Sequence, residues 1–127
     1  MADSGTGTAG RVEELYRRVR AAVEARRPIA AIYHNRFRLL CPHRLGRNKD
    51  RQLRVLSYQY GGESERGLKP VGSPANWRCM ALDELSAVEV LNGAWQTASN
   101  HSRPASCIVE ADVDADDHPG GDPQNGQ

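Results

Sequence analysis

The chain has 127 residues, of which 39% are hydrophobic and 26% are charged, and its formal net charge is +1. This length predicts one small domain, and no apolar run comes near the roughly 20 residues that a membrane-spanning helix needs. The N-terminal residues lack the basic and apolar regions of a secretory signal, so we expect a cytoplasmic protein that has no contact with membranes.

The net charge conceals an asymmetry between the two halves of the chain. Residues 11–54 carry 13 basic and 4 acidic side chains, whereas residues 55–127 carry 4 basic and 11 acidic ones. A local basic field attracts anions even when the whole chain is nearly neutral. The basic half is therefore interpreted either as a surface for an anionic partner or as a solvated face.

The first ordered element predicted along the chain is a helix that follows a polar N-terminal tail. Residues 1–10 and 114–127 are small and polar, so we expect disordered tails that bury too little surface to fold. Between residues 11 and 27, apolar side chains recur every three or four positions, as is typical of an amphipathic helix. Pro28 follows two arginines, and this combination favours a helix end.

After the helix the pattern changes to short strands. Runs of apolar and β-branched residues between polar turns predict five strands, over residues 29–34, 37–41, 53–60, 77–82 and 85–91. Pro42 either ends or bulges the second strand, and a polar turn follows at residues 46–50. Residues 61–76 are rich in glycine and proline and predict a long loop.

One helix followed by about five strands predicts an α+β fold, with a small bent antiparallel sheet or barrel and the helix over one open end. We expect the main domain to span residues 11–91. Residues 92–113 are expected to form a weakly ordered extension, within which residues 107–113 are a candidate edge strand. The acidic residues 114–127 are expected to form a disordered tail that screens the basic half.

The three cysteines do not suggest a disulfide framework. Cys41, Cys79 and Cys107 are odd in number and widely spaced, so we expect reduced thiols, with Cys41 and Cys79 buried in strands. A zinc site that also uses His43 and His101 was the alternative, but paired Cys-x-x-Cys knuckles are absent. The sequence therefore predicts neither a metal nor a cofactor.

The chain also lacks the motifs of common enzymes. It has no Gly-x-Ser-x-Gly elbow, no phosphate-binding loop and no dinucleotide fingerprint. Asp112 to Asp116 begins like a calcium loop, but Asp117 and Pro123 stand where glycine and glutamate are needed. No acid, base or nucleophile pair is recognisable, so we expect no catalytic residues and no enzymatic activity.

Motifs in a fixed order along residues 12–91 carry a family resemblance: Pro42-His43-Arg44-Leu45, the strand 53–59 and the segment 77–88. Together they resemble the WYL domain family, in which a short helix precedes an Sm-like or SH3-like β-barrel. The Pro-His-x-Leu element resembles the branch found in bacterial defence and stress regulators. The resemblance implies that a five-stranded antiparallel Sm/SH3-like β-barrel follows the N-terminal amphipathic helix.

The match to the family motifs is degenerate. Leu53-Arg54-Val55 stands where the family has Trp-Tyr-Leu. The family's Arg-x-Phe-x-Leu-x-Arg-Ile strand begins here at Arg78, but Met80 replaces its phenylalanine and Glu84 its second arginine. The change at Glu84 removes one positive charge and adds a negative one, which opposes a strongly anion-binding groove.

WYL domains generally act as sensors that bind nucleotides or nucleic acid in a basic groove and alter the activity of an attached domain. The resemblance implies that His43, Arg54 and Arg78 line such a groove, since an arginine fork grips phosphate with two hydrogen bonds. Tyr58 shares strand parity with Arg54 and is a candidate for stacking on a base. The leading hypothesis is a stand-alone regulatory module that binds a nucleotide or single-stranded nucleic acid and modulates a partner.

The alternative hypothesis is a protein-interaction or homo-oligomerisation module with a vestigial groove. The barrel edge or the apolar stripe of the helix would then dock a partner or a second copy. Strand parity leaves the sidedness open as well, because Arg54 and Tyr58 would lie on the barrel exterior if Leu53, Val55 and Ser57 point inward.

Overall fold

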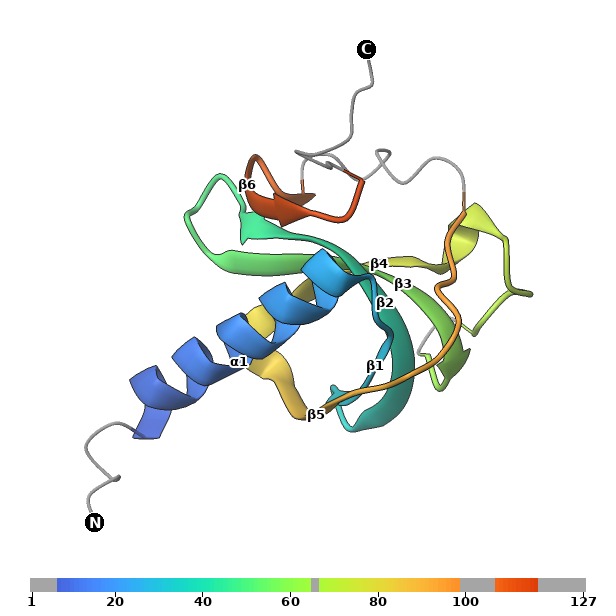
Figure 1. The fold of residues 1–127 in the computed structure, drawn as a ribbon, viewed down its shortest axis with the longest axis horizontal. Helices are drawn as coiled ribbons and strands as arrows, with labels where there is room; N and C mark the ends of the chain where they lie inside the picture. The colour runs from blue at the N-terminus through green and yellow to red at the C-terminus, as the bar shows by residue number, and fades with distance from the viewer. Residues whose placement is uncertain (1–6, 65–66, 99–106, 117–127) are drawn as a thin grey trace.

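The computed structural model describes residues 7–64, 67–98 and 107–116 (Figure 1). The N-terminal helix α1 spans Gly7–Ala25. Six strands follow it: β1 Ile29–Tyr33, β2 Arg36–Arg47, β3 Leu53–Gly62, β4 Trp77–Ala81, β5 Leu85–Val90 and β6 Glu110–Asp114. Two single-turn 3-10 helices precede β4 and β5, namely η2 Pro74–Asn76 and η3 Leu82–Glu84.

The amphipathic pattern of α1 places its apolar stripe against the sheet. Leu15, Val19 and Val23 are buried in the core, while the exposed face carries ion pairs one turn apart, such as Arg17 with Glu13 at 3.3 Å. The predicted helix is confirmed, but both of its ends differ. It begins at Gly7, so residues 7–10, expected in a disordered tail, belong to the helix. It ends at Ala25 and not at residue 27, because Arg26 has a φ of 54° that an α-helix cannot continue. The stripe is thus occupied by the chain's own core.

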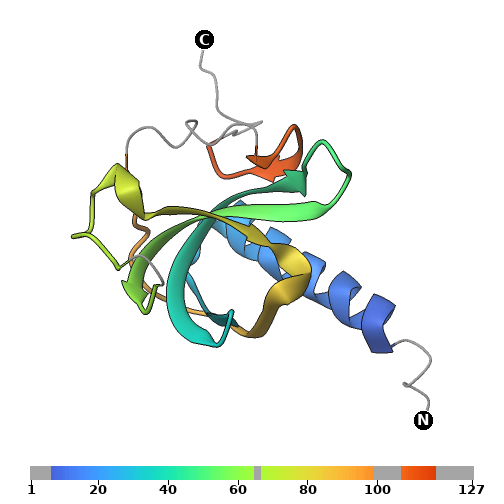
Figure 2. The same cartoon turned by 180° about the vertical axis from the view of Figure 1, so that it is seen from behind.

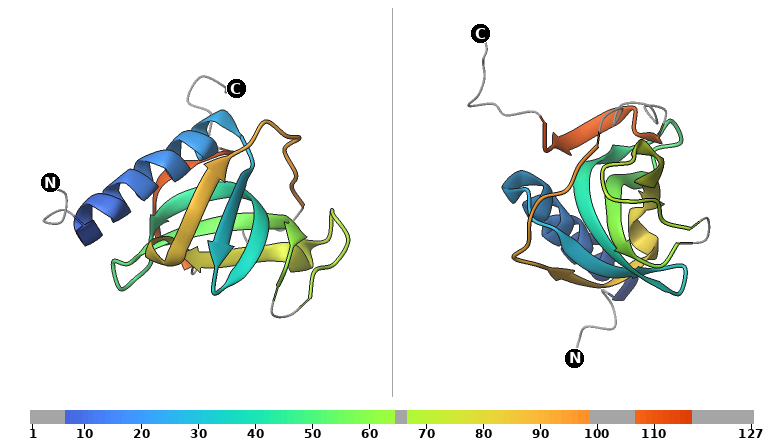
Figure 3. Two further views of the ribbon diagram at one scale, coloured as in Figure 1. Left: turned by 90° about the horizontal axis from the view of Figure 1, so that it is seen from below. Right: turned by 90° about the vertical axis from the view of Figure 1, so that its right-hand side faces the viewer.

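The strands form one antiparallel sheet in the order β4-β3-β2-β1-β5, and β6 pairs with β2. β2 is twelve residues long; its first half lies beside β1, and its last residues, Arg44 to Arg47, lie beside β6. The sheet is strongly bent and α1 lies along one side of it (Figures 2 and 3). The α+β class with an N-terminal helix is confirmed. Within the described residues no strand pairing joins β4 to β5, so hydrogen bonds do not close the sheet.

All five predicted strands are present, and β2 is the one whose limits differ most. It continues through Pro42 to Arg47, so the prediction that the proline ends the strand is wrong and its alternative, a bulge, is confirmed. The pairing register with β3 shifts between Pro42 and Arg44, which leaves His43 as the extra residue. The turn then falls after Arg47, where the Asn48 side chain accepts hydrogen bonds from the backbone at Asp50 and Gln52.

The core lies between α1 and the concave side of the sheet. Successive residues of β3 point to opposite faces of the sheet. Val55 points into the core, whereas Leu56 and Tyr58 lie on the other face. That other face is also covered. Trp95 and Thr97 contact β2 from one segment, and Ile108, which is buried, approaches the backbone at Gly46 from another.

The C-terminal residues join the sheet. The predicted edge strand is confirmed as β6, although it begins at Glu110. Asp114, expected in a disordered tail, is the last residue of that strand, and the next residue, Ala115, is buried. The division of the chain into a main domain and a weakly ordered extension stays a prediction, but the described parts of 92–113 pack on β2.

The cysteines differ from the prediction of reduced thiols. Cys79 and Cys107 form a disulfide with a Cα–Cα distance of 6.1 Å, and Cys79 is exposed on β4 and not buried. Strand parity gives the reason: Cys79 pairs with Leu56 and so points away from the core, on the face where Cys107 lies. Cys41 is free and fully buried, as predicted.

None of the helices in the described part of the chain is long and apolar enough to cross a membrane.

Candidate functional site

The four predicted site residues fall in three separate places. His43 and Tyr58 belong to a buried aromatic cluster, Arg78 lies against a loop, and Arg54 lines a surface pocket. The structure therefore does not bring them together in one groove. The parity alternative is the one observed, because Val55 and Ser57 are buried on the inner side while Arg54 lies on the outer face.

His43 sits at the centre of the aromatic cluster, which we define as His43, Tyr58, Trp77 and Trp95. Its ring lies 4.7 Å from Trp77 and 4.6 Å from Trp95, measured between centroids. Nδ1 is 2.8 Å from the carbonyl oxygen of Cys41, and Nε2 is 3.0 Å from the Thr97 hydroxyl. Both ring nitrogens thus have protein partners and the ring is buried. His43 therefore holds the segment that carries Trp95 and Thr97 on the β2 bulge.

Tyr58 has a comparable structural role. Its hydroxyl donates to the carbonyl oxygen of Ser73 and accepts from the backbone N–H of Gly72, both at 2.8 Å. The ring packs edge-on against Trp77, with the centroids 5.1 Å apart. Because Tyr58 is fully buried, no face of the ring is open for a nucleic-acid base. The stacking role of Tyr58 stays a prediction, and its burial does not support it.

Arg78 uses its guanidinium to order the loop between β3 and β4. Nη1 donates to the carbonyl oxygen of Ala75 at 2.8 Å, and Nη2 donates to the Ser64 hydroxyl at 3.0 Å. A guanidinium already committed to a hydroxyl and a carbonyl would have to leave them in order to grip a phosphate. Arg78 is therefore better explained as a support for the loop than as a ligand-binding residue.

Arg54 alone lines a concave surface. A pocket of about 350 Å³ opens between the start of α1, the β2–β3 turn and η3, and its walls are Val12, Arg51, Gln52, Leu53, Arg54, Ala81, Asp83 and Glu84. We call it the Arg54 pocket. Among the described residues, nothing forms an ion pair or hydrogen bond with the Arg54 guanidinium.

The Arg54 pocket contains both signs of charge, but two of its four charged groups are engaged elsewhere. Glu84 lies 2.6 Å from His34 Nε2, and Arg51 pairs with Glu110 at 3.1 Å. The Asp83 carboxylate, like Arg54, has no partner in the described parts of the chain. The pocket thus offers a fork of N–H donors and a separate acceptor carboxylate. This combination suits a ligand that carries an anionic group together with hydroxyl or amino donors.

The pairing of β6 with β2 forms a charged site that the sequence patterns do not predict. Asp114 lies 2.8 Å from Arg44, and Asp112 lies 2.8 Å from Arg47. Asp112 also accepts a hydrogen bond from the Tyr16 hydroxyl at 2.7 Å. Burial, and after it this bond, raises the pKa of Tyr16. The available signal was the alternation of acidic and small residues from Glu110 to Asp114, which has the two-residue period of a strand.

Three comparisons were made for this chain: with models of protein families, with curated proteins and with solved structures. None of them found a match. The candidate site therefore rests on the geometry of this chain.

Proposed function

We propose that this chain is a regulatory module that binds a nucleotide-like anionic ligand in the Arg54 pocket and modulates a partner through that binding. The observation that carries the proposal is the Arg54 guanidinium, which lines a concave surface and has no protein partner in the described residues. An arginine fork is suited to a phosphate or carboxylate. Asp83 of η3, which also lines the pocket, supplies an acceptor for ribose hydroxyl or base amino groups.

The scaffold we propose is a five-stranded Sm/SH3-like barrel of the kind found in WYL domains. The strand order β4-β3-β2-β1-β5 and the single turn η3 between β4 and β5 support it, as do the sequence motifs. Of the residues that the resemblance implies for the groove, Arg54 is the one whose position in a pocket supports the proposal. Single-stranded nucleic acid is less favoured as a ligand, because Tyr58 is buried.

The alternative module, which would dock a partner at a sheet edge, has less support. Arg11 and Arg18 of α1 donate to the carbonyl oxygens of Leu85 and Val88 on the end strand β5. At the other end strand, β4, the backbone N–H of Ala81 donates to the Tyr33 hydroxyl at 3.0 Å. Three backbone groups of these two end strands thus already have partners on α1 or at Tyr33, which weakens the case for docking a partner at β4 or β5.

The cytoplasmic location expected from the sequence stays a prediction. The Cys79–Cys107 disulfide argues against it, because disulfides persist mainly in oxidising compartments. Mass measurement of the protein isolated with its thiols blocked at the moment of lysis would show which state the cell maintains.

The test of the proposed function is the thermal unfolding midpoint in the presence of nucleotides, cyclic dinucleotides and short oligonucleotides. A ligand that binds the native state raises the midpoint according to its concentration relative to its Kd. We expect a nucleotide to raise it, and we expect Arg54→Ala to weaken binding by about tenfold or more. Arg54→Lys keeps the positive charge but loses the guanidinium fork, so its affinity for the nucleotide should lie between those of the native chain and of Arg54→Ala.

The matched control is Arg17→Ala, which removes the same charge from the exposed face of α1. It should bind the nucleotide as the native chain does. A panel without any shift would contradict the proposal, and equal affinity in the Arg54→Ala and Arg17→Ala variants would contradict the assignment of the pocket.

A further inference from the structure

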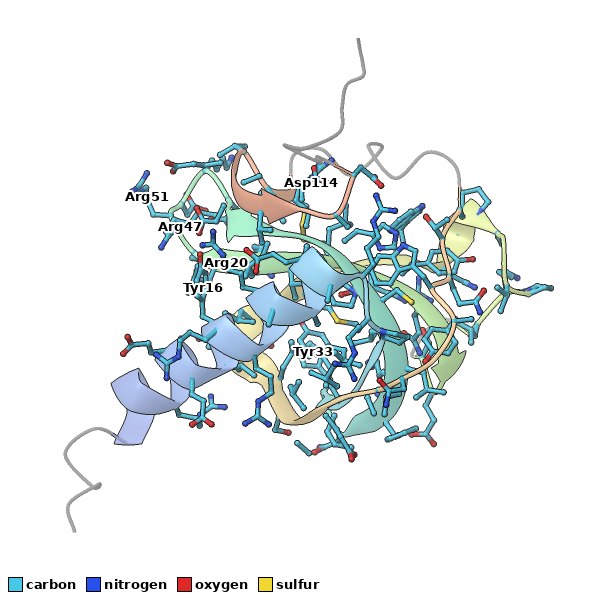
Figure 4. All side chains as sticks on the ribbon, in the orientation of Figure 1. Tyr16, Arg20, Tyr33, Arg47, Arg51 and Asp114 are labelled. Carbon is cyan, nitrogen blue, oxygen red and sulfur yellow. A yellow bond between two sulfur atoms is a disulfide. The ribbon has the colours of Figure 1, made fainter. Side chains whose placement is uncertain are left out.

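The surface on which β6 lies has features of a binding site for an extended peptide. We call this surface the β6 seat and define it as Arg44 to Arg47 of β2 together with Arg51 and Tyr16. Figure 4 shows Tyr16 of α1 near Arg47 and Arg51, and Asp114 further along β6. The seat thus draws on the helix, on β2 and on the turn after it.

The charges of the seat and of β6 match in register. Three acidic residues, each two positions from the next, face three arginines: Glu110 pairs with Arg51, Asp112 with Arg47, and Asp114 with Arg44. The Arg44–Asp114 pair is the most enclosed, with side chains that are 18% and 21% exposed, and the Arg51–Glu110 pair is the most open, at 74% and 57%. Recognition thus follows a repeat of one acid every second residue.

The backbone of the seat also receives a strand. Arg44 pairs with Asp114 and Arg47 with Glu110 in antiparallel register, and beyond β6 the Ala115 N–H donates to the carbonyl oxygen of His43 at 2.7 Å. Gly46 allows this approach, because a Cβ there would collide with the Glu110 carbonyl oxygen and lie 2.8 Å from the Cα of Ala111. Any larger residue at Gly46 would push the added strand away.

β6 itself contributes little that another acidic segment lacks. None of its five residues is fully buried; the buried anchors are Ile108 before it and Ala115 after it. Arg26 caps this end by donating to the Ala115 carbonyl oxygen from Nε at 3.1 Å and Nη2 at 2.7 Å. The strand is held by charge, by backbone hydrogen bonds, by the packing of Val113 against the core and by the disulfide at Cys107, three residues before it.

We propose that the β6 seat is a strand-addition site for an acidic, extended segment of a partner protein, and that β6 occupies it as a built-in competitor. The partner segment carries an acidic residue at every second position, an apolar residue at the place of Val113, and a small or apolar residue at each end. The ladder of backbone hydrogen bonds favours a peptide over a nucleic acid, which supplies negative charge but no N–H and C=O groups at strand spacing. This site is distinct from the proposed ligand pocket, although Arg51 borders both.

The experiment uses the whole chain and a fluorescent peptide with the sequence of residues 108–116. In the chain variant Asp112→Asn/Asp114→Asn the competitor is weakened while the arginines of the seat remain. We expect this variant to bind the peptide at least about tenfold more tightly than the native chain does, because a larger fraction of its seats is open. A peptide with asparagine at both of those aspartate positions should bind at least about tenfold more weakly to the same variant.

Two controls locate the binding. Adding Arg47→Ala to the opened variant should abolish peptide binding, whereas adding Arg17→Ala, which removes an equal charge at an exposed position of α1 outside the seat, should leave it unchanged. Arg54→Ala should also leave it unchanged, so a failure of the ligand pocket and a failure of the seat are distinguishable. Circular dichroism establishes that each variant is folded.

Three outcomes would overturn the proposal. The peptide could bind no more tightly to the opened variant than to the native chain, the asparagine peptide could bind equally well, or a short oligothymidylate could bind the opened variant more tightly than the peptide. If the double variant fails to fold, the native chain is titrated with peptide and its amide spectrum recorded. Joint shifts of the amides of Arg44–Arg47 and of Glu110–Asp114 would support exchange at the seat, and unchanged amides would overturn it.

Discussion

The apolar core under α1 and the β6 seat lie on the same strand, β2, but they are held together by different forces. In the core, Leu40 and Leu45 of β2 are fully buried against Val19 and its neighbours. At the seat, β6 packs only Val113 against the core, and arginine–carboxylate pairs and backbone hydrogen bonds are added to that contact. Burial of large apolar side chains is worth more than partly exposed ion pairs, so the two regions should differ in stability and in their response to salt.

The largest effect is expected in the core. Leu40→Ala removes a fully buried side chain, and the cavity left behind should lower the free energy of unfolding by about 3 kcal/mol. Urea denaturation measures this change. The control Val71→Ala truncates a side chain that is 54% exposed and should change the free energy by less than about 0.5 kcal/mol. Equal effects of the two substitutions would mean that the core is assigned incorrectly.

The disulfide variant should come next in size. Cys79 and Cys107 are 28 positions apart. In the chain-entropy account, a crosslink over a loop of this length raises the free energy of unfolding by about 3.5 kcal/mol, because it restricts the unfolded chain, and measured gains are commonly smaller. Cys79→Ser/Cys107→Ser should therefore reduce the urea midpoint and raise hydrogen exchange first in β6. A variant as stable as the native chain, with β6 still protected, would show that the disulfide does not hold the strand.

A comparison within the seat sharpens the contrast further. Asp114→Asn breaks the enclosed pair with Arg44, and we expect a loss of about 1 kcal/mol that shrinks as salt is added. Glu110→Gln breaks the exposed pair with Arg51 and should cost less than about 0.5 kcal/mol. Urea denaturation at low and high salt distinguishes them. If the two losses were equal, enclosure would not be what gives the Asp114 pair its strength.

Cys41 gives the smallest effect near neutral pH. Burial raises the pKa of its thiol from an ordinary 9.0 to about 11, so the native chain should not react with a thiol reagent at pH 8 until urea unfolds it. The pKa of the Cys41 thiol is higher in the folded chain than in the unfolded chain. The protonated thiol therefore makes its full contribution to the free energy of unfolding below about pH 9, and this contribution is lost as the pH rises towards 11. Rapid labelling of Cys41 in the native chain would contradict its burial.

The elements of the core were predictable from local patterns, and the candidate sites were not. A period of three or four residues placed α1, and alternation placed the strands, because each pattern reflects a face that must be buried. The burial of Tyr58 and the roles of His43 and Arg78 depend on segments far away in the chain, such as the one that brings Thr97 to His43. A pattern within one strand carries no information about what covers its second face.

The same reason explains β6. Its acidic residues resemble a solvated tail when only composition is considered, and they become strand residues because Arg44 and Arg47 of β2 provide partners at the matching spacing. The disulfide between Cys79 and Cys107 was hidden in the same way, since an odd number of cysteines gives no pairing on its own. The acidic residues at every second position from Glu110 to Asp114 were the local signal for this strand.

The most direct test of the difference between the two regions is native-state hydrogen exchange at low and high salt. The amides of Val109 and Ala115, which donate to Arg47 and His43, report on the β6 seat, and the amide of Val55 reports on the core strand β3. We expect the first two to exchange through a local opening that high salt makes easier, and Val55 to exchange only through global unfolding. Equal protection of all three amides at both salt concentrations would contradict the account, because β6 would then be as firmly held as the core.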